Sequence, residues 1–241
     1  MYPKLVVATL AASFIGAAVG QQDGSAAKEK IVAALKSSVT KNQAALKSYA
    51  WTETTQISLK GEVKKTQQKE CRYGPDGKVQ KTPIGGENPP QQQQAAGGGR
   101  RGGRLKKEIV EKKVGEMKDY MERVTALVHE YAPPDPLKIQ AAASAGNVSV
   151  TRGQPVTTIA IKNYLKQGDS VTLGFDSAAK KLSTYNVDSY LDNPKDDPVK
   201  LAANFAQLPD GTNHVQQSVL DAAGKNIQVK VTNSGYKKIG Q

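Results

Sequence analysis

The sequence predicts an α+β fold in which helices pack on one face of a curved antiparallel sheet. Near both ends of the chain, apolar side chains alternate with polar ones between turn signals spaced about ten residues apart, which is typical of a half-buried antiparallel sheet. Between these regions, residues 105–131 repeat apolar side chains at helical spacing. Aromatic residues make up only 5% of the chain, so a core must consist mainly of Val, Ile, Leu and Ala.

The first twenty residues have the layout of a secretory signal peptide. Lys4 precedes an uncharged run from Leu5 to Val19, and Ala18 and Gly20 place small residues at the −3 and −1 positions. The run is about 15 residues long, which is shorter than a membrane span. We therefore expect an exported protein, periplasmic or secreted and soluble after cleavage, whose residues 21–241 form a single domain.

Residues 25–48 are expected to form a helix, because apolar side chains recur there at helical spacing. From Tyr49 the period changes to two, which predicts a strand that ends at Leu59 before a Lys60–Gly61 turn. Residues 62–73 continue as an unusually polar strand, which indicates an edge or solvent-facing position. The turn signal Pro75-Asp76-Gly77 then precedes a short third strand over residues 78–84.

Residues 85–104 are expected to be a disordered insert. They contain Pro89-Pro90, four consecutive glutamines and a Gly/Arg run, with no apolar side chain larger than alanine. The insert has no aromatic residue for base stacking, and export disfavours nucleic acid as a partner. A flexible linker is one interpretation. Binding to an anionic surface through Arg100, Arg101 and Arg104 is the other.

Residues 105–131 predict the clearest helix. Seven apolar residues alternate spacings of four and three: Val110, Val114, Met117, Met121, Val124, Val128 and Tyr131. This heptad stripe fits a coiled-coil dimer, but Ile109, Tyr120 and Leu127 broaden it, which favours a helix lying on a sheet. Pro133 and Pro134 end the helix, and Asp135-Pro136 provides a cap and first-turn proline for a short helix over residues 137–145.

After Gly146 the sequence predicts an antiparallel meander to the end of the chain. Its strands are marked by alternating apolar residues: Val148, Val156, Val171, Leu173, Phe175, Tyr185, Val187, Leu191, Val199, Leu201, Phe205, Val215, Val219, Ile227, Val229 and Val231. The turns between them carry Gly, Asn, Asp or Pro, as in Gln167-Gly168-Asp169 and Pro209-Asp210-Gly211.

No arrangement of residues predicts catalysis, a cofactor or a metal site. Cys71 is the only cysteine, so the chain has no internal disulfide and no cysteine-based metal site. The two histidines, His129 and His214, are interpreted as surface or boundary residues, and no nucleophile elbow or phosphate-binding glycine loop occurs. Four aspartates, Asp188, Asp192, Asp196 and Asp197, could hold calcium or act as a glycosidase pair, but a solvated turn explains them better. We expect a non-enzymatic protein, with a secreted hydrolase as a weaker alternative.

The order of elements, together with the signal peptide, resembles that of LolA-type periplasmic lipoprotein carriers and their lipoprotein-sorting relatives. The resemblance covers most of residues 21–241 in element order, without a functional motif that matches residue by residue. It implies an unclosed β-barrel that helices cover like a lid, with a cavity that takes up acyl chains. The Gly/Arg insert and the polar second strand depart from that pattern.

We therefore expect an exported carrier for lipid, lipoprotein acyl chains or another apolar ligand. The candidate cavity lining is Trp51, Ile57, Leu59, Leu173, Phe175, Tyr185 and Phe205, with Met117 and Met121 as a flexible lid. The alternative is a structural or interaction module that binds an anionic envelope polymer or membrane, because the chain has a formal charge of +12. For any single one of these apolar residues, plain core packing is the better explanation.

Overall fold

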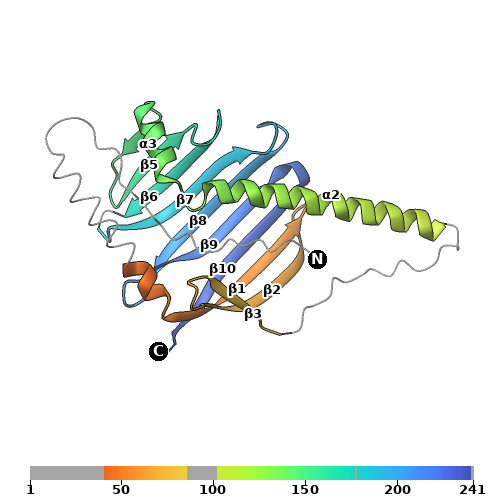
Figure 1. Cartoon of the computed structure of the whole chain (residues 1–241), viewed down its shortest axis with the longest axis horizontal. Coiled ribbons are helices and arrows are strands. Elements are labelled where there is room, and N and C mark those ends of the chain that lie inside the picture. Colours follow the sequence, from red (N-terminus) through yellow and green to blue (C-terminus); the bar gives the residue numbers. More distant parts are fainter. Residues whose placement is uncertain (1–40, 86–101, 177, 240–241) are drawn as a thin grey trace.

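The computed structural model describes residues 41–85, 102–176 and 178–239, which build one ten-stranded antiparallel sheet with helices on one of its faces (Figure 1). The strands lie in the order β3-β2-β1-β10-β9-β8-β7-β6-β5-β4. Because β3 and β4 lie at opposite edges and do not pair, the sheet is not closed into a barrel. The predicted α+β class, with a curved open sheet covered on one face, is confirmed.

The N-terminal strands form where their sequence predicts them. Residues 41–46 are helical and lead into β1 (Tyr49–Leu59), β2 (Glu62–Tyr73) and β3 (Val79–Pro83). Lys60 and Gly61 both have positive φ, 53° and 81°, as a tight two-residue hairpin turn requires. The rest of the predicted helix over residues 25–48, and the predicted signal peptide, lie outside the described residues.

Two helices connect β3 to the meander. α2 (Gly102–Tyr131) begins three residues before the predicted Leu105, so the last three residues of the predicted insert are helical. The other residues of that insert from 86 to 101 lie outside the described part. α3 (Pro136–Ser144) begins as predicted with a cap, because the Asp135 side chain accepts a hydrogen bond from the Leu137 backbone N–H.

The meander contains seven strands, and the last one closes the chain back onto the first. These strands are β4 (Val148–Thr151), β5 (Val156–Lys162), β6 (Ser170–Asp176), β7 (Lys181–Tyr190), β8 (Pro198–Gln207), β9 (Asn213–Ala222) and β10 (Ile227–Lys238). A single 3-10 turn, η1 (Ala223–Lys225), separates β9 from β10. β10 then pairs antiparallel with β1, which places the N-terminal hairpin beside the end of the chain.

One face of the sheet, here called the inner face, carries the apolar core. The strand register aligns a continuous row of aliphatic residues across it: Val148, Ile161, Val171, Val187, Leu201, Leu220, Val229 and Ile57. Most of this row is buried, whereas the opposite face carries mainly Thr, Ser, Asn and Gln. Successive side chains of a strand point to opposite faces of the sheet. The apolar residues of each strand therefore face the core, and the polar residues between them face solvent.

Within the described part of the chain, no helix combines the length and apolar character needed to cross a membrane.

Candidate functional site: the inner face of the sheet beside α2

The C-terminal half of α2 fills the centre of the inner face. Tyr120, Val124, Val128 and Tyr131 are buried in the same cluster as the inner-face residues of β6 to β10. A hollow remains between Leu127, Val128 and Tyr131 on the helix and Val187, Ser189, Val199 and Leu201 on the sheet, with room for about one water molecule. The space directly beneath this half of α2 is therefore packed core and cannot hold an acyl chain without movement of the helix.

The margin of this buried cluster, here called the margin of α2, is different, because apolar side chains there are only partly buried. Ile57 and Leu59 on β1, Met117 and Met121 on α2, and Phe205 and Val215 on β8 and β9 pack against the central cluster but keep part of their surface exposed. Figure 1 shows α2 crossing the sheet as a single bar near the end of β1 and continuing beyond the sheet edge. This margin is the apolar surface of the inner face that a ligand could reach.

The structure brings most of the predicted lining residues together, but in two different environments. Leu173 and Tyr185 are fully buried in the core, so they support the fold from within. Ile57, Leu59, Met117, Met121 and Phe205 lie at the margin. Phe175 is half-buried on β6, where it is paired with Thr157 and Leu182. Trp51 lies in a separate aromatic cluster.

That aromatic cluster, formed by Tyr49, Trp51, Tyr73, His214 and Tyr236, was not predicted as a unit. The Trp51 and Tyr236 rings stack with centroids 5.6 Å apart and an angle of 13° between their planes. The His214 ring lies 4.2 Å from that of Tyr236. Burial lowers the pKa of His214 and raises the pKa of Tyr236, so both side chains favour their neutral forms. The pairing of β1 with β10 creates this cluster, and local spacing gives no sign of that pairing.

A buried ion pair lies next to the cluster. The Lys81 ammonium on β3 donates to both oxygens of the Glu53 carboxylate on β1, at 2.6 and 2.7 Å. Cys71, which stands between them on β2, is completely buried, and burial followed by the charge of Glu53 raises its thiol pKa to about 11. The Cys71 thiol therefore remains protonated at neutral pH, and a protonated, buried thiol is a poor nucleophile.

Two of the four aspartates considered as a calcium or glycosidase site have ordinary structural partners. Asp188 pairs with Lys200 at 3.0 Å, and Asp192 pairs with Arg123 of α2 at 2.6 Å. The second pair attaches α2 to the β7–β8 loop. Among the described residues, no group of three or more His, Cys, Asp or Glu side chains is arranged to hold a metal ion.

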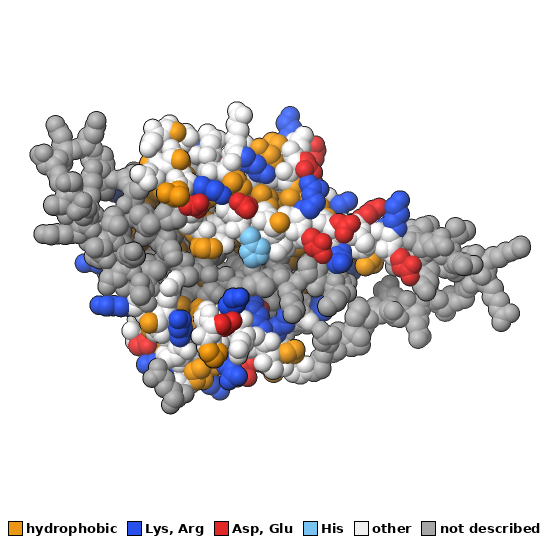
Figure 2. Space-filling model, in the orientation of Figure 1, with side chains coloured by type: hydrophobic (Ala, Val, Ile, Leu, Met, Phe, Trp, Pro, Cys, Tyr) orange, Lys and Arg blue, Asp and Glu red, His pale blue; other side chains and the backbone are white. Residues whose placement is uncertain are grey.

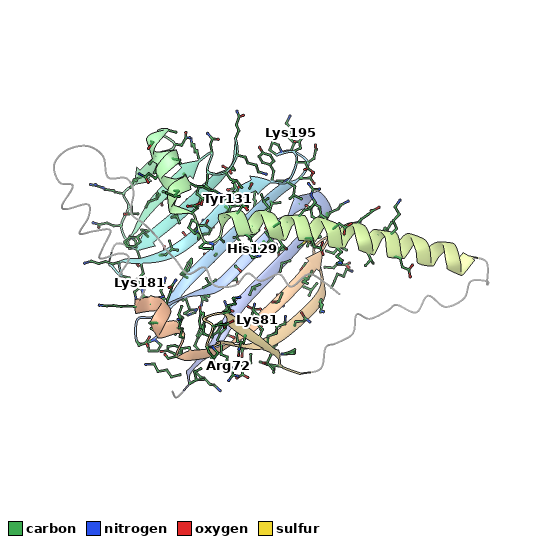
Figure 3. All side chains as sticks on the ribbon, in the orientation of Figure 1. Arg72, Lys81, His129, Tyr131, Lys181 and Lys195 are labelled. Atoms are coloured by element: carbon green, nitrogen blue, oxygen red, sulfur yellow. The ribbon has the colours of Figure 1, made fainter. Side chains whose placement is uncertain are left out.

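The remaining candidate residues lie away from this surface. Arg100 and Arg101 lie outside the described residues, and Arg104 belongs to the first turn of α2, where only the backbone is described. His129 is exposed on α2, one residue after the buried Val128 (Figure 3).

Comparison with protein-family models, curated proteins and solved structures finds no match to this chain.

Proposed function

We propose that this protein is an exported, non-catalytic carrier that holds an acyl chain, or another elongated apolar ligand, at the margin of α2 on the inner face. The observation that carries the proposal is the set of aliphatic side chains left partly exposed where a single helix crosses a ten-stranded open sheet. Ile57, Leu59, Met117 and Met121 form its part nearest to β1.

The physical basis is removal of apolar surface from water. Each methylene group of an acyl chain that becomes buried contributes about 0.8 kcal/mol. Methionine suits such a margin because its flexible, polarizable side chain fits ligands of different shape. The order of elements, which resembles that of LolA-type lipoprotein carriers, supports the same class of ligand.

The arrangement of polar groups supports a binding role over catalysis. Cys71 is buried and protonated, and the carboxylates of Asp188 and Asp192 are engaged in ion pairs. His214 is buried beside Tyr236.

Native mass spectrometry of the protein purified from its own producing cells tests this proposal. We expect co-purified lipid, and we expect a fluorescent fatty-acyl probe to bind the delipidated protein with an affinity on the order of micromolar. An added lipid should displace the probe. A protein that carries no lipid and binds no probe would contradict the carrier proposal.

A further inference from the structure

The positive charge of the protein is concentrated at one edge of the sheet. Residues 41–85 and 227–239, which contain β3, β2, β1 and β10, carry twelve Lys or Arg side chains and four Asp or Glu side chains. The other described residues carry sixteen basic and fifteen acidic side chains. We call the first group the basic edge. It holds nearly all of the net charge of the described protein, and Figure 2 shows several of its Lys and Arg side chains below α2.

Few of these charges are neutralised by neighbours. Within the described residues, Lys81 pairs with Glu53, Lys64 pairs with Glu62, and Lys238 pairs with Asp210. Arg72, Lys78 and Lys237 are exposed and form no ion pair with a described residue. These three side chains are therefore available to an external anion.

The strand register places two of these charges on one face. Arg72 on β2 and Lys237 on β10 both stand opposite Ala50 of β1, so they lie two strands apart, about 10 Å. Lys78 lies in the turn that joins β2 to β3. Because Arg72 and Lys237 stand on the same face of the sheet, both charges can contact one anionic surface.

The basic edge also exposes large aliphatic side chains. Val63 on β2 is 57% exposed, Ile84 after β3 is 45% exposed, and Ile239 after β10 is 37% exposed. Only three other large apolar residues in the described part are comparably exposed: Val114, Leu137 and Val150. Aliphatic groups among lysines suit a lipid bilayer, where the charges meet anionic headgroups and the aliphatic groups enter the interface. A soluble polyanion would use the charges and leave the aliphatic groups in water.

We infer that the basic edge docks the protein on the surface of a membrane that contains anionic lipids. Ala50 and Ile57 lie an odd number of residues apart on β1, so Arg72 and Lys237 stand on the solvated face, and docking would place that face of β2, β1 and β10 against the bilayer. The surface is separate from the Gly/Arg insert that the sequence suggests for anion binding. The inference stands whether or not the inner face binds an acyl chain.

Vesicle flotation tests this inference. We expect the protein to float with vesicles of phosphatidylcholine mixed with phosphatidylglycerol, to stay behind with pure phosphatidylcholine, and to be released by added salt. A basic side chain near an anionic membrane contributes about 1 kcal/mol, so the triple variant Arg72→Gln, Lys78→Gln, Lys237→Gln should lower the partition coefficient about 100-fold.

A matched variant separates position from net charge. Arg152→Gln, Lys162→Gln, Lys195→Gln also removes one arginine and two lysines, all exposed, from outside the basic edge. It should partition within about threefold of the unmodified protein. Equal losses in the two triple variants, or no flotation of the unmodified protein, would overturn the inference. Binding of the soluble acyl probe, measured without vesicles, should be unchanged in both variants, so the two proposals can fail separately.

Discussion

The hydroxyl of Tyr131 donates a 2.6 Å hydrogen bond to the Oδ2 atom of Asp169, which joins the last residue of α2 to the turn between β5 and β6. Asp169 is buried and also accepts hydrogen bonds from the backbone N–H groups of Tyr164, Leu165 and Lys166. Burial, followed by the bond to Asp169, raises the pKa of Tyr131 and keeps its hydroxyl protonated. This network fixes the end of α2 on the sheet.

Replacing Tyr131 with Phe should lower the free energy of unfolding by about 1–3 kcal/mol, because a buried carboxylate then loses a hydrogen-bond donor. Urea titration measures the change. Tyr190→Phe is the matched control, since the Tyr190 hydroxyl donates to the Gln167 carbonyl at an exposed site and its loss should cost less than about 0.5 kcal/mol. Equal effects of the two substitutions would show that the Tyr131–Asp169 bond adds nothing specific to stability.

The heptad stripe of α2 gives a second prediction. Val124 is completely buried against the sheet, whereas Val114, on the same stripe, is 53% exposed. Val124→Asp should lower the free energy of unfolding by more than about 3 kcal/mol, because it buries an unpaired charge, and Val114→Asp should change it by less than about 0.5 kcal/mol. Thermal and urea unfolding of both variants measure this. A large loss from Val114→Asp would mean that the first half of α2 packs against a second copy of the chain.

The heptad stripe of α2 also shows what a sequence pattern can predict and what it cannot. Its spacing predicts which side of α2 is apolar, but spacing is a property of the helix alone and cannot say how much of the helix has a sheet beneath it. The structure buries Tyr120, Val124, Val128 and Tyr131 and leaves Val114 exposed. The turn at Lys60–Gly61 and the helix start at Asp135–Pro136 were predicted correctly, because their causes are local. The turn needs residues with positive φ, and the helix start needs a capping side chain and a first-turn proline.

Contacts between distant parts of the chain were not predictable in the same way. The stacking of Trp51 on Tyr236 and the ion pair of Glu53 with Lys81 depend on which strands become neighbours. Alternation of apolar residues determines the face to which each side chain points, but it does not specify which strand becomes the neighbour. For the same reason, the sequence could not separate the candidate lining residues into buried and partly exposed ones. Leu173 and Ile57 share the alternation pattern, but Leu173 is buried in the core and Ile57 is only partly buried.

His214 gives a prediction for the dependence of stability on pH. Burial lowers its pKa from 6.5 in the folded protein, so below that pH the unfolded chain takes up a proton that the folded chain does not. The free energy of unfolding should therefore fall as the pH falls from about 7 to about 5. Urea unfolding across this range measures the slope.

The only other histidine provides the control for this measurement. His214→Phe should reduce the dependence of the unfolding free energy on pH, and it keeps an aromatic ring beside Tyr236. His129→Gln, on the exposed face of α2, should leave that dependence unchanged. If the slope survives in His214→Phe, other groups titrate in its place and the buried histidine does not control stability in this range.

The last prediction separates ligand contacts from core packing at the margin of α2. Ile57 and Leu59 are only partly buried, so replacing both with Gln should cost less stability than a change at the buried Leu173. If an acyl chain lies against them, the double variant should weaken binding of a fluorescent acyl probe at least tenfold, because two aliphatic contacts of roughly 1 kcal/mol each are lost. The matched control, Leu137→Gln with Val150→Gln, removes two exposed aliphatic residues elsewhere and should leave probe affinity unchanged. Fluorescence titration gives the affinity, and urea unfolding of the same samples gives the stability. A large loss of stability in Ile57→Gln, Leu59→Gln with no change in probe affinity would identify the margin as ordinary core and place the ligand elsewhere.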